Sequence, residues 1–209
     1  SILDVKCSEA EARRLIPAWV ILVRQMLAAL GWPAERKYSS LILEGGVSLG
    51  FTAPIDVLYT ASEVNEWAYA ACDAELNGAE LPDFPAAVER LGAAAKEEAN
   101  SRLLELEALA DEHGVTMLWD DDEVSLGLGR HAKTWGVREL PDPASVDWQA
   151  HGDIPMCLVT GTNGKTTTVR LSANILRASF DTVWLSSTDY IAIDGRVVDR
   201  DDWAGPGGA

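Results

Sequence analysis

Apolar side chains recur in two patterns along residues 1–135, every three to four residues in some segments and every second residue in others. The first spacing is typical of amphipathic helices and the second of half-buried strands. Ser8 followed by Glu11 is the pattern of a capping box, and Gly45-Gly46 is a two-residue hairpin turn. Predicted helices cover residues 8–30, 54–76 and 85–113, and predicted strands cover 2–7, 40–44, 47–52, 115–119 and 123–128. We expect an α+β N-terminal domain over 1–135, which the sequence assigns to no family.

The stretch 136–154 carries two prolines and two glycines without a sustained period, and we interpret it as a linker. After it the pattern changes to an apolar strand over 155–160, a glycine-rich loop, a helix over 165–178 and a strand over 182–187. This order is the opening βαβ unit of a parallel sheet. We therefore expect residues 155–209 to form an α/β domain, the start of a doubly wound parallel sheet that is incomplete here. Residues 190–193 and 196–198 then flank Asp194-Gly195, which predicts a further hairpin turn.

The net charge and hydropathy of the chain exclude some classes of binding partner. Its 209 residues carry 17 Lys and Arg against 33 Asp and Glu, a formal net charge of −16. An acidic surface repels phosphate backbones and anionic lipid, so we expect no nucleic-acid partner and no membrane partner. The longest apolar stretch, 16–30, is interrupted by Arg24 and Gln25 and is too short to cross a bilayer. The sequence therefore predicts a cytoplasmic protein.

The three cysteines give no sign of a metal site or a disulfide framework. Cys7, Cys72 and Cys157 lie far apart and form neither a CxxC pair nor a Cys-His pair at metal-ligand spacing. We interpret all three side chains as reduced, buried thiols.

One segment carries recognisable chemistry, the run Thr-Gly-Thr-Asn-Gly-Lys-Thr-Thr-Thr over residues 160–168. Glycines lack Cβ atoms, so successive backbone N–H groups can converge on one anion, and a helix N-terminus adds partial positive charge. At this spacing Lys165 would reach the β and γ phosphates, and the Thr166 hydroxyl would bind Mg²⁺. The run therefore predicts a phosphate-binding loop (P-loop).

Two observations leave another interpretation of this run open. The strict P-loop pattern has a glycine five residues before Gly164, where this chain has Val159. In addition, a glycine turn before a helix that merely begins with Lys and Thr would have a similar local sequence. The order of strand, glycines, lysine, hydroxyl and helix favours phosphate binding.

The run over 160–168 resembles the ATP-binding loop of the Mur ligase superfamily, in which the departure at Val159 is usual. The stretch Ser-Thr-Asp-Tyr-Ile-Ala-Ile-Asp-Gly-Arg over 187–196 and the segment Ala-Gly-Pro-Gly-Gly-Ala over 204–209 are most similar to the Mur-ligase-like module of the cyanophycin synthetase family. The resemblance covers about residues 155–209. It implies the P-loop ATP-binding domain of that superfamily, with ATP and Mg²⁺ as cofactors.

The resemblance also implies a role for each residue of the loop. The cofactor-binding residues that it implies are Gly161, Thr162, Asn163, Gly164, Lys165, Thr166 and Thr167. Lys165 would be the catalytic residue, stabilising charge at the transferring γ-phosphoryl group, and Thr166 would hold the metal ion. In the superfamily a substrate carboxylate attacks the γ-phosphorus, an acyl phosphate forms, and an amine displaces phosphate to give an amide.

Two residues outside the loop are candidate substrate contacts. Asp189 follows the second predicted strand, where a turn-capping role is equally compatible with the sequence. Trp203 lies in the segment that contacts substrate in related ligases. Peptidoglycan ligases of the third-residue-adding type carry paired threonines where this chain has Trp203-Ala204, so the resemblance does not extend to a UDP-sugar peptide substrate.

Further elements of the superfamily are expected outside residues 1–209. Its metal-binding acid, histidine, modified lysine and C-terminal amino-acid-binding domain follow the segments found here, so we expect the amino-terminal part of a longer ligase, inactive alone. The expected partners are ATP, a carboxylate and an amine substrate that are peptide or amino-acid derived, and the remainder of the ligase in the same or a second chain. Two other functions stay open: a P-loop kinase or other phosphotransferase, and a non-catalytic nucleotide-binding scaffold.

Overall fold

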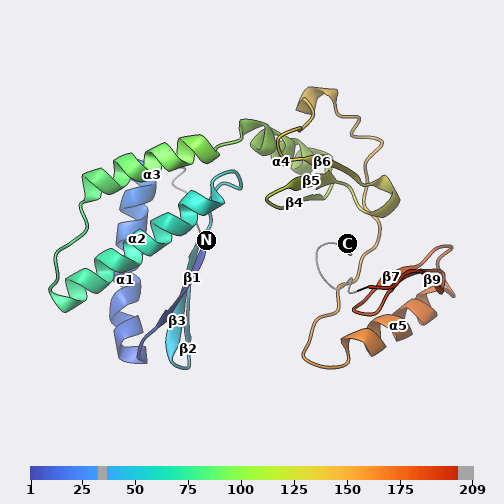
Figure 1. Cartoon of the computed structure of the whole chain (residues 1–209), viewed down its shortest axis with the longest axis horizontal. Helices are drawn as coiled ribbons and strands as arrows, with labels where there is room; N and C mark the ends of the chain where they lie inside the picture. The colour runs from blue at the N-terminus through green and yellow to red at the C-terminus, as the bar shows by residue number, and fades with distance from the viewer. Residues whose placement is uncertain (33–36, 202–209) are drawn as a thin grey trace. The chain divides into compact units, whose positions relative to one another are not determined.

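The computed structural model describes residues 1–32 and 37–201. Its contacts divide the chain into two compact units, unit 1 over Ser1–Ile154 and unit 2 over Pro155–Ala209. Figure 1 shows the helices and strands of both units. The division into 1–135, 136–154 and 155–209 that the sequence suggests stays a prediction.

Unit 1 begins with a three-stranded antiparallel sheet of order β1-β3-β2 and three helices. Their bounds are β1 Ile2–Lys6, α1 Glu9–Ala29, β2 Tyr38–Leu43, β3 Gly46–Phe51, α2 Leu58–Asn77 and α3 Phe84–Glu98. The predicted capping box is confirmed, since Ser8 accepts the Glu11 N–H while the Glu11 carboxylate accepts the Ser8 N–H at 2.8 Å. The predicted hairpin between β2 and β3 is also confirmed, but its turn lies at Glu44-Gly45 rather than at the predicted Gly45-Gly46, because Gly46 pairs with Leu43 as the first residue of β3.

The first core of unit 1 joins this sheet to α1, α2 and α3. Trp19, Met26, Leu49 and Leu91 are among its largest fully buried side chains. The indole N–H of Trp19 donates to Asn65 Oδ1 at 2.8 Å, and the Asn65 amide donates to the Leu49 carbonyl at 3.1 Å. These bonds satisfy the polar groups that burial removes from water.

A second core of unit 1 joins α4 to an antiparallel sheet of order β4-β5-β6. The bounds are α4 Ser101–His113, β4 Met117–Trp119, β5 Glu123–Leu126 and β6 Lys133–Gly136, with 3₁₀ turns η1 Gly129–His131 and η2 Pro143–Ser145. Leu106, Val124 and Leu126 are fully buried in it. Leu140, from the segment interpreted as a linker, is buried in the same cluster, so part of that segment packs within unit 1.

The single helix predicted over 85–113 is wrong, because the chain forms α3 and α4 with a break between them. Ala99 leaves the helical region with ψ 131°, and the Asn100 side chain caps α4 by accepting the Leu103 N–H at 3.3 Å. Asp56 accepts the Asn100 N–H at 3.0 Å. Apolar spacing continues across the break, so periodicity alone does not reveal it.

Unit 2 contains α5 and, among its described residues, a small antiparallel sheet of order β7-β8-β9. Their bounds are α5 Lys165–Leu176, β7 Trp184–Ser186, β8 Ile191–Ile193 and β9 Arg196–Asp199. The buried cluster consists of Ala173, Val183, Leu185 and Ala192. The hairpin predicted at Asp194-Gly195 is confirmed, with φ of 50° and 83° at the two turn residues.

The segment 155–160, predicted as the first strand of a parallel sheet, has no strand assignment. Its Leu158 is 84% exposed and its Met156 55% exposed. Every strand pair within residues 1–32 and 37–201 is antiparallel. A strand inside a doubly wound sheet has a hydrogen-bonded neighbour on each side, and none is described for this segment. The parallel P-loop sheet therefore stays a prediction.

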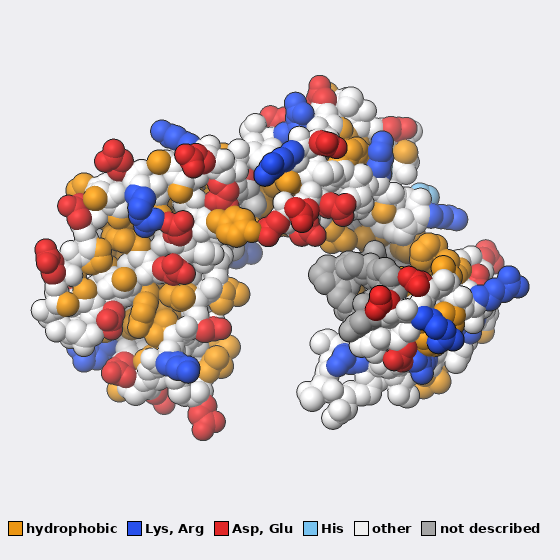
Figure 2. All heavy atoms as spheres, in the orientation of Figure 1, with side chains coloured by type: hydrophobic (Ala, Val, Ile, Leu, Met, Phe, Trp, Pro, Cys, Tyr) orange, Lys and Arg blue, Asp and Glu red, His pale blue; other side chains and the backbone are white. Residues whose placement is uncertain are grey.

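The surface of unit 1 is strongly acidic, as the composition predicts. Figure 2 shows Asp and Glu side chains spread over the visible face of this unit, with fewer Lys and Arg among them. Within the part of the chain that the structure describes, no helix has the length and apolar character needed to span a membrane.

The three cysteines differ in exposure. Cys72 is buried, and burial raises the pKa of its thiol to about 11. Cys7 is partly buried, whereas Cys157 is exposed. The prediction of three buried thiols is therefore wrong for Cys157, because no strand within residues 1–32 and 37–201 pairs with the segment that carries it.

Candidate nucleotide-binding site

The predicted phosphate-binding loop is exposed on unit 2 and leads directly into α5. Gly161 and Gly164 have φ of 149° and 78°, values that residues with a Cβ rarely adopt. Gly164 is the N-cap residue of α5, and a Cβ placed on it would meet no atom within 4 Å. The backbone conformation, rather than crowding, therefore requires glycine at this position.

The N-terminus of α5 has no capping side chain. A backbone bond of 2.9 Å runs from the Thr168 N–H to the Gly164 carbonyl, and no side chain accepts at the cap. The N–H groups of residues 165–167 therefore lie at the positive end of the helix dipole without a side-chain partner at the cap. Because phosphate binds at such helix starts, these residues fit the triphosphate that the sequence predicts.

Lys165, the first residue of α5, folds back across the loop. Its ammonium group donates to the Gly161 carbonyl at 2.6 Å. An ammonium group has three donors, so two remain for phosphate oxygens in this conformation. The predicted catalytic lysine thus lies at the mouth of the loop, and its catalytic role stays a prediction.

Thr166 lies on the face of α5 that faces the end of β7. Its Oγ1 is 3.5 Å from the Oγ1 of Thr188. Hydroxyl oxygens are hard ligands of the kind that Mg²⁺ accepts. Sequence analysis missed Thr188, although its place directly after a predicted strand is where a site residue of an α/β sheet is expected.

The remaining predicted residues are placed as follows. Thr162, Asn163 and Thr167 are exposed around the start of α5, where their polar groups are accessible. Trp203 lies outside the residues that the structure describes. The assigned roles of all of these residues stay predictions.

Asp189 forms an ion pair with Arg170 of α5. The Arg170 guanidinium also lies 4.9 Å from the ring centroid of Tyr190. Sequence analysis missed Arg170, although its place four residues after Thr166 puts the two side chains on one helix face. A substrate contact of Asp189 stays a prediction, while its partner in the structure is this arginine.

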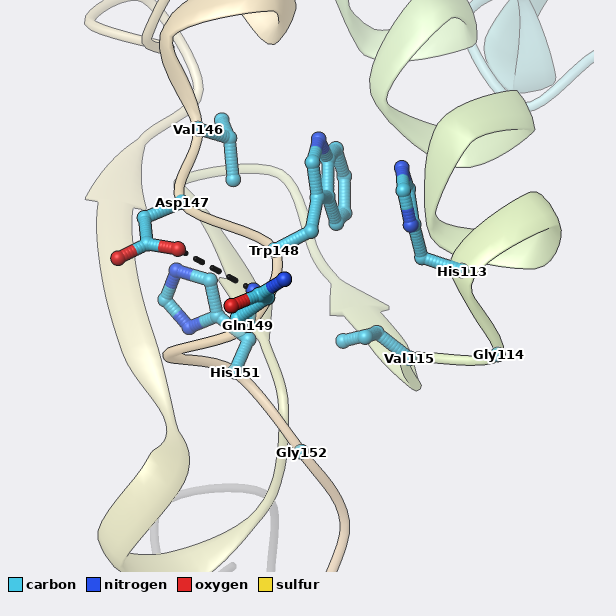
Figure 3. Close-up of a pocket in the computed structure, with 9 residues that line it drawn as sticks. All are labelled: His113, Gly114, Val115, Val146, Asp147, Trp148, Gln149, His151 and Gly152. Atoms are coloured by element: carbon cyan, nitrogen blue, oxygen red, sulfur yellow. Dashed lines mark hydrogen bonds between the residues drawn. The ribbon is translucent and has the colours of Figure 1, made fainter.

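A cavity of about 590 Å³ lies in unit 1, between the end of α4 and the segment after η2 (Figure 3). The rings of His113 and Trp148 stack there, with centroids 4.9 Å apart and planes at 11°. His151 lies on the other side of Trp148 in this view, and Asp147 accepts the Gln149 N–H at 3.3 Å. The predicted loop does not line this cavity, and no group of three His, Cys, Asp or Glu side chains in residues 1–32 and 37–201 could hold a metal ion.

Comparison with known proteins identifies relatives of one segment of the chain. A stretch of 53 residues is 53% identical to a cyanophycin synthetase of Synechocystis sp., covering 25% of this chain and 6% of the relative. Cyanophycin synthetases of Crocosphaera subtropica and Geminocystis herdmanii are 45% and 49% identical over 53 residues, with the same coverage. The chain thus matches a small part of the length of these relatives. No protein-family model matches it.

Three relatives with the same name therefore match this chain at about half of the positions in the aligned segment. The superfamily resemblance of the run over 160–168 is consistent with that name. Across 25% of its length this chain is similar to cyanophycin synthetases, and the resemblance to that family expected for residues 155–209 is confirmed.

Proposed function

We propose that unit 2 is the nucleotide-binding part of an ATP-dependent amide ligase, related to the Mur-ligase-like module of cyanophycin synthetases. The observation that carries the proposal is the uncapped start of α5, which follows Gly161 and Gly164 in a run that resembles the ATP-binding loop of that superfamily. The matched stretches are 53 to 55 residues long, about the length of unit 2. We infer that the similarity falls in this unit.

Different groups at the start of α5 would bind the phosphates and the metal ion of MgATP. The N–H groups of residues 165–167 would bind phosphate oxygens, and the two remaining donors of Lys165 would neutralise charge at the γ-phosphoryl group. The Thr166 hydroxyl would hold Mg²⁺, which supplies further positive charge at the phosphates when bound. The predicted contacts of Thr162, Asn163 and Thr167 with the triphosphate belong to the same proposal.

In the proposed reaction, a carboxylate oxygen of the substrate attacks the γ-phosphorus of ATP and ADP leaves. An amine then attacks the acyl carbon, phosphate leaves, and an amide bond forms. Residues of this chain contribute positioning and charge neutralisation rather than covalent chemistry. We propose that the carboxylate and the amine belong to peptide or amino-acid-derived substrates.

Unit 2 exposes apolar side chains that a doubly wound sheet would cover. The exposed residues include Met156, Leu158, Leu171, Ile175 and Trp184. Parallel sheets of this class are buried on both faces, and exposed apolar patches mark surfaces that receive other protein. We propose that the remainder of the ligase, in the same or a second chain, covers these side chains, and that 155–160 forms a strand of the completed parallel sheet.

The test is titration of the 209-residue chain with ATP and Mg²⁺ by isothermal calorimetry. We expect Lys165→Ala to weaken the affinity by roughly 10- to 100-fold, because one hydrogen bond to a charged group contributes about 1.5–3 kcal/mol. Lys96→Ala, at an exposed position of α3 in unit 1, removes the same charge and is the matched control. Its affinity is expected to equal that of the wild type.

The proposal is contradicted if the wild-type chain does not bind MgATP, or if Lys165→Ala binds it equally well. In the completed ligase, Lys165→Ala should abolish ATP turnover. A stable phosphoester product, in place of an amide and free phosphate, would instead identify a phosphotransferase. Nucleotide binding without turnover in the completed assembly would identify a scaffold.

A further inference from the structure

One face of α5 contacts three consecutive residues of the turn between β7 and β8. Thr166 and Arg170 are four residues apart and therefore lie on the same face of the helix. Thr166 lies 3.5 Å from Thr188 between hydroxyl oxygens, and Arg170 contacts Asp189 and Tyr190. Side-chain contacts thus join the end of α5 that carries the predicted phosphate-binding loop to this turn.

The turn itself is held in one conformation by Ser187. This residue is buried, and its hydroxyl donates to the Tyr190 carbonyl at 3.1 Å while accepting the Asp189 N–H at 3.3 Å. These hydrogen bonds restrict the backbone between residues 187 and 190. A contact that holds Asp189 in place therefore also holds its neighbour Thr188.

The small core of unit 2 increases the importance of these contacts. Only Ala173, Val183, Leu185 and Ala192 form its buried cluster among the described residues. The Arg170–Asp189 pair is about half exposed, with side-chain exposures of 43% and 51%. Exposed ion pairs contribute little to stability, so the effect of this pair is on orientation. The guanidinium is suited to that task because it contacts a carboxylate and an aromatic ring at once.

We propose that Arg170 is a positioning residue: it fixes the Ser187–Tyr190 turn against α5 so that the Thr188 hydroxyl stays beside Thr166, and the affinity for metal-bound nucleotide depends on that placement. This inference rests on the proposed function, because it requires Thr166 to face the Mg²⁺ of MgATP. It assigns Asp189 to holding Arg170 rather than to contacting substrate. Arg170 acts through the turn and touches neither nucleotide nor metal.

The test compares the affinities of the 209-residue chain for ATP with Mg²⁺ and for ATP in the presence of a chelator. We expect Arg170→Ala to weaken binding of MgATP about tenfold, as loss of an outer-sphere partner does at other metal sites, and to leave binding of metal-free ATP unchanged. Asp189→Asn is expected to match it. Arg170→Lys keeps the charge but not the planar group, and is expected to fall between Arg170→Ala and the wild type.

The double variant Arg170→Ala/Asp189→Asn is expected to lose no more affinity than either single variant, since the two residues act as one unit. Arg13→Ala is the control, because it breaks the exposed Arg13–Glu9 pair of α1 with the same change in charge. Neither its nucleotide affinity nor its ratio of metal-bound to metal-free affinity should change.

The outcomes separate this inference from the proposed function. If the wild type binds MgATP and Lys165→Ala binds it more weakly, but Arg170→Ala binds MgATP as the wild type does, the inference is overturned and the proposed function stands. Equal losses with and without Mg²⁺ also overturn it, since they indicate a general structural role. If Arg170→Ala does not fold, as judged by circular dichroism, Asp189→Asn tests the inference instead, through the ratio of its affinities for MgATP and for metal-free ATP.

Discussion

The helices of unit 1 and the helix of unit 2 begin in different ways. In unit 1, α1, α3 and α4 start after Ser8, Asp83 and Asn100, and each of these side chains accepts an N–H of the first turn. No residue caps α2 from its own start, but the Glu98 carboxylate accepts two N–H groups of its first turn. Helix α5 starts at Gly164, with no side-chain cap. Side chains of unit 1 thus accept N–H groups in the first turns of its helices, whereas within the described residues no side chain caps the start of α5, where we propose that nucleotide binds.

The two units also differ in how completely they bury their large apolar side chains. Trp19 and Met26 in the first core of unit 1 are completely buried. In unit 2, Trp184 is 60% exposed and Ile175 is 64% exposed. Unit 1 also exposes some apolar side chains, such as Ile2 at 75% and Leu41 at 58%, but it buries large residues completely, whereas the buried cluster of unit 2 among the described residues is small. Such a unit is suited to bind other groups, and this difference leads to three predictions besides those for Lys165 and Arg170.

The strongest test of the comparison is Gly164→Val. A β-branched residue is strongly disfavoured at a φ of 78°, so the start of α5 should change conformation and its N–H groups should turn away together. Loss of two hydrogen bonds to a charged ligand, at about 1.5 kcal/mol each, corresponds to a roughly hundredfold lower affinity for MgATP. Calorimetric titration of the 209-residue chain measures it.

The matched control for this variant is Gly78→Val. Gly78 ends α2 at a φ of 66°, and a Cβ there also meets no atom within 4 Å. The same substitution should lower the free energy of unfolding by at least about 1–2 kcal/mol without changing the affinity for MgATP. An unchanged affinity in Gly164→Val would show that the backbone at the start of α5 does not hold nucleotide.

A smaller effect, on the stability of unit 1, is expected when the side chain that caps the start of α2 is removed. Glu98→Ala removes the acceptor of the Tyr59 N–H at 2.7 Å and of the Thr60 N–H and hydroxyl, both at 2.8 Å. We expect the free energy of unfolding, measured in urea, to fall by about 2–3 kcal/mol, because two partly buried donors of Thr60 and the exposed Tyr59 N–H lose a charged acceptor. The exposed neighbour Glu97 provides the control, with an expected change within about 0.5 kcal/mol for Glu97→Ala. Equal effects of the two substitutions would show that Glu98 does not cap α2.

The least perturbing test is alkylation of the cysteines at pH 8, followed by mass spectrometry. Cys157 is exposed and should react first, whereas Cys72 is buried with its thiol pKa raised to about 11 and should react only after unfolding. The modified chain should keep its free energy of unfolding within about 0.5 kcal/mol. Protection of Cys157 would contradict the exposed segment described here and would favour a covered strand over 155–160.

Local sequence predicted the features that depend on a few neighbouring residues. The capping box of α1 needs only Ser8 and Glu11, and the β8–β9 turn needs only Asp194-Gly195. The break between α3 and α4 could not be predicted in this way. It involves an Asp56 bond to the Asn100 N–H, between residues 44 positions apart, while the apolar spacing continues unchanged.

The candidate site shows the same limit. The loop residues, with Lys165 at their end, could be named because the chemistry of a phosphate cradle requires those residue types at that spacing. The sequence positions of Thr188 and Arg170 provided only a weak signal, because their importance comes from contacts across 22 and 19 positions of the chain. The stacking of His113 on Trp148 was equally invisible to pattern analysis.

The order of residues alone thus determined where the glycine-rich loop that we propose as a phosphate site and its helix begin, since a backbone turn and a helix start depend on chemistry within about one helical turn. Tertiary structure decided which other side chains face that helix. It also decided that the first turn of α2 is capped by Glu98, a residue distant along the chain. Those arrangements depend on how strands and helices pack, and packing brings together residues whose separation along the chain carries no local signal.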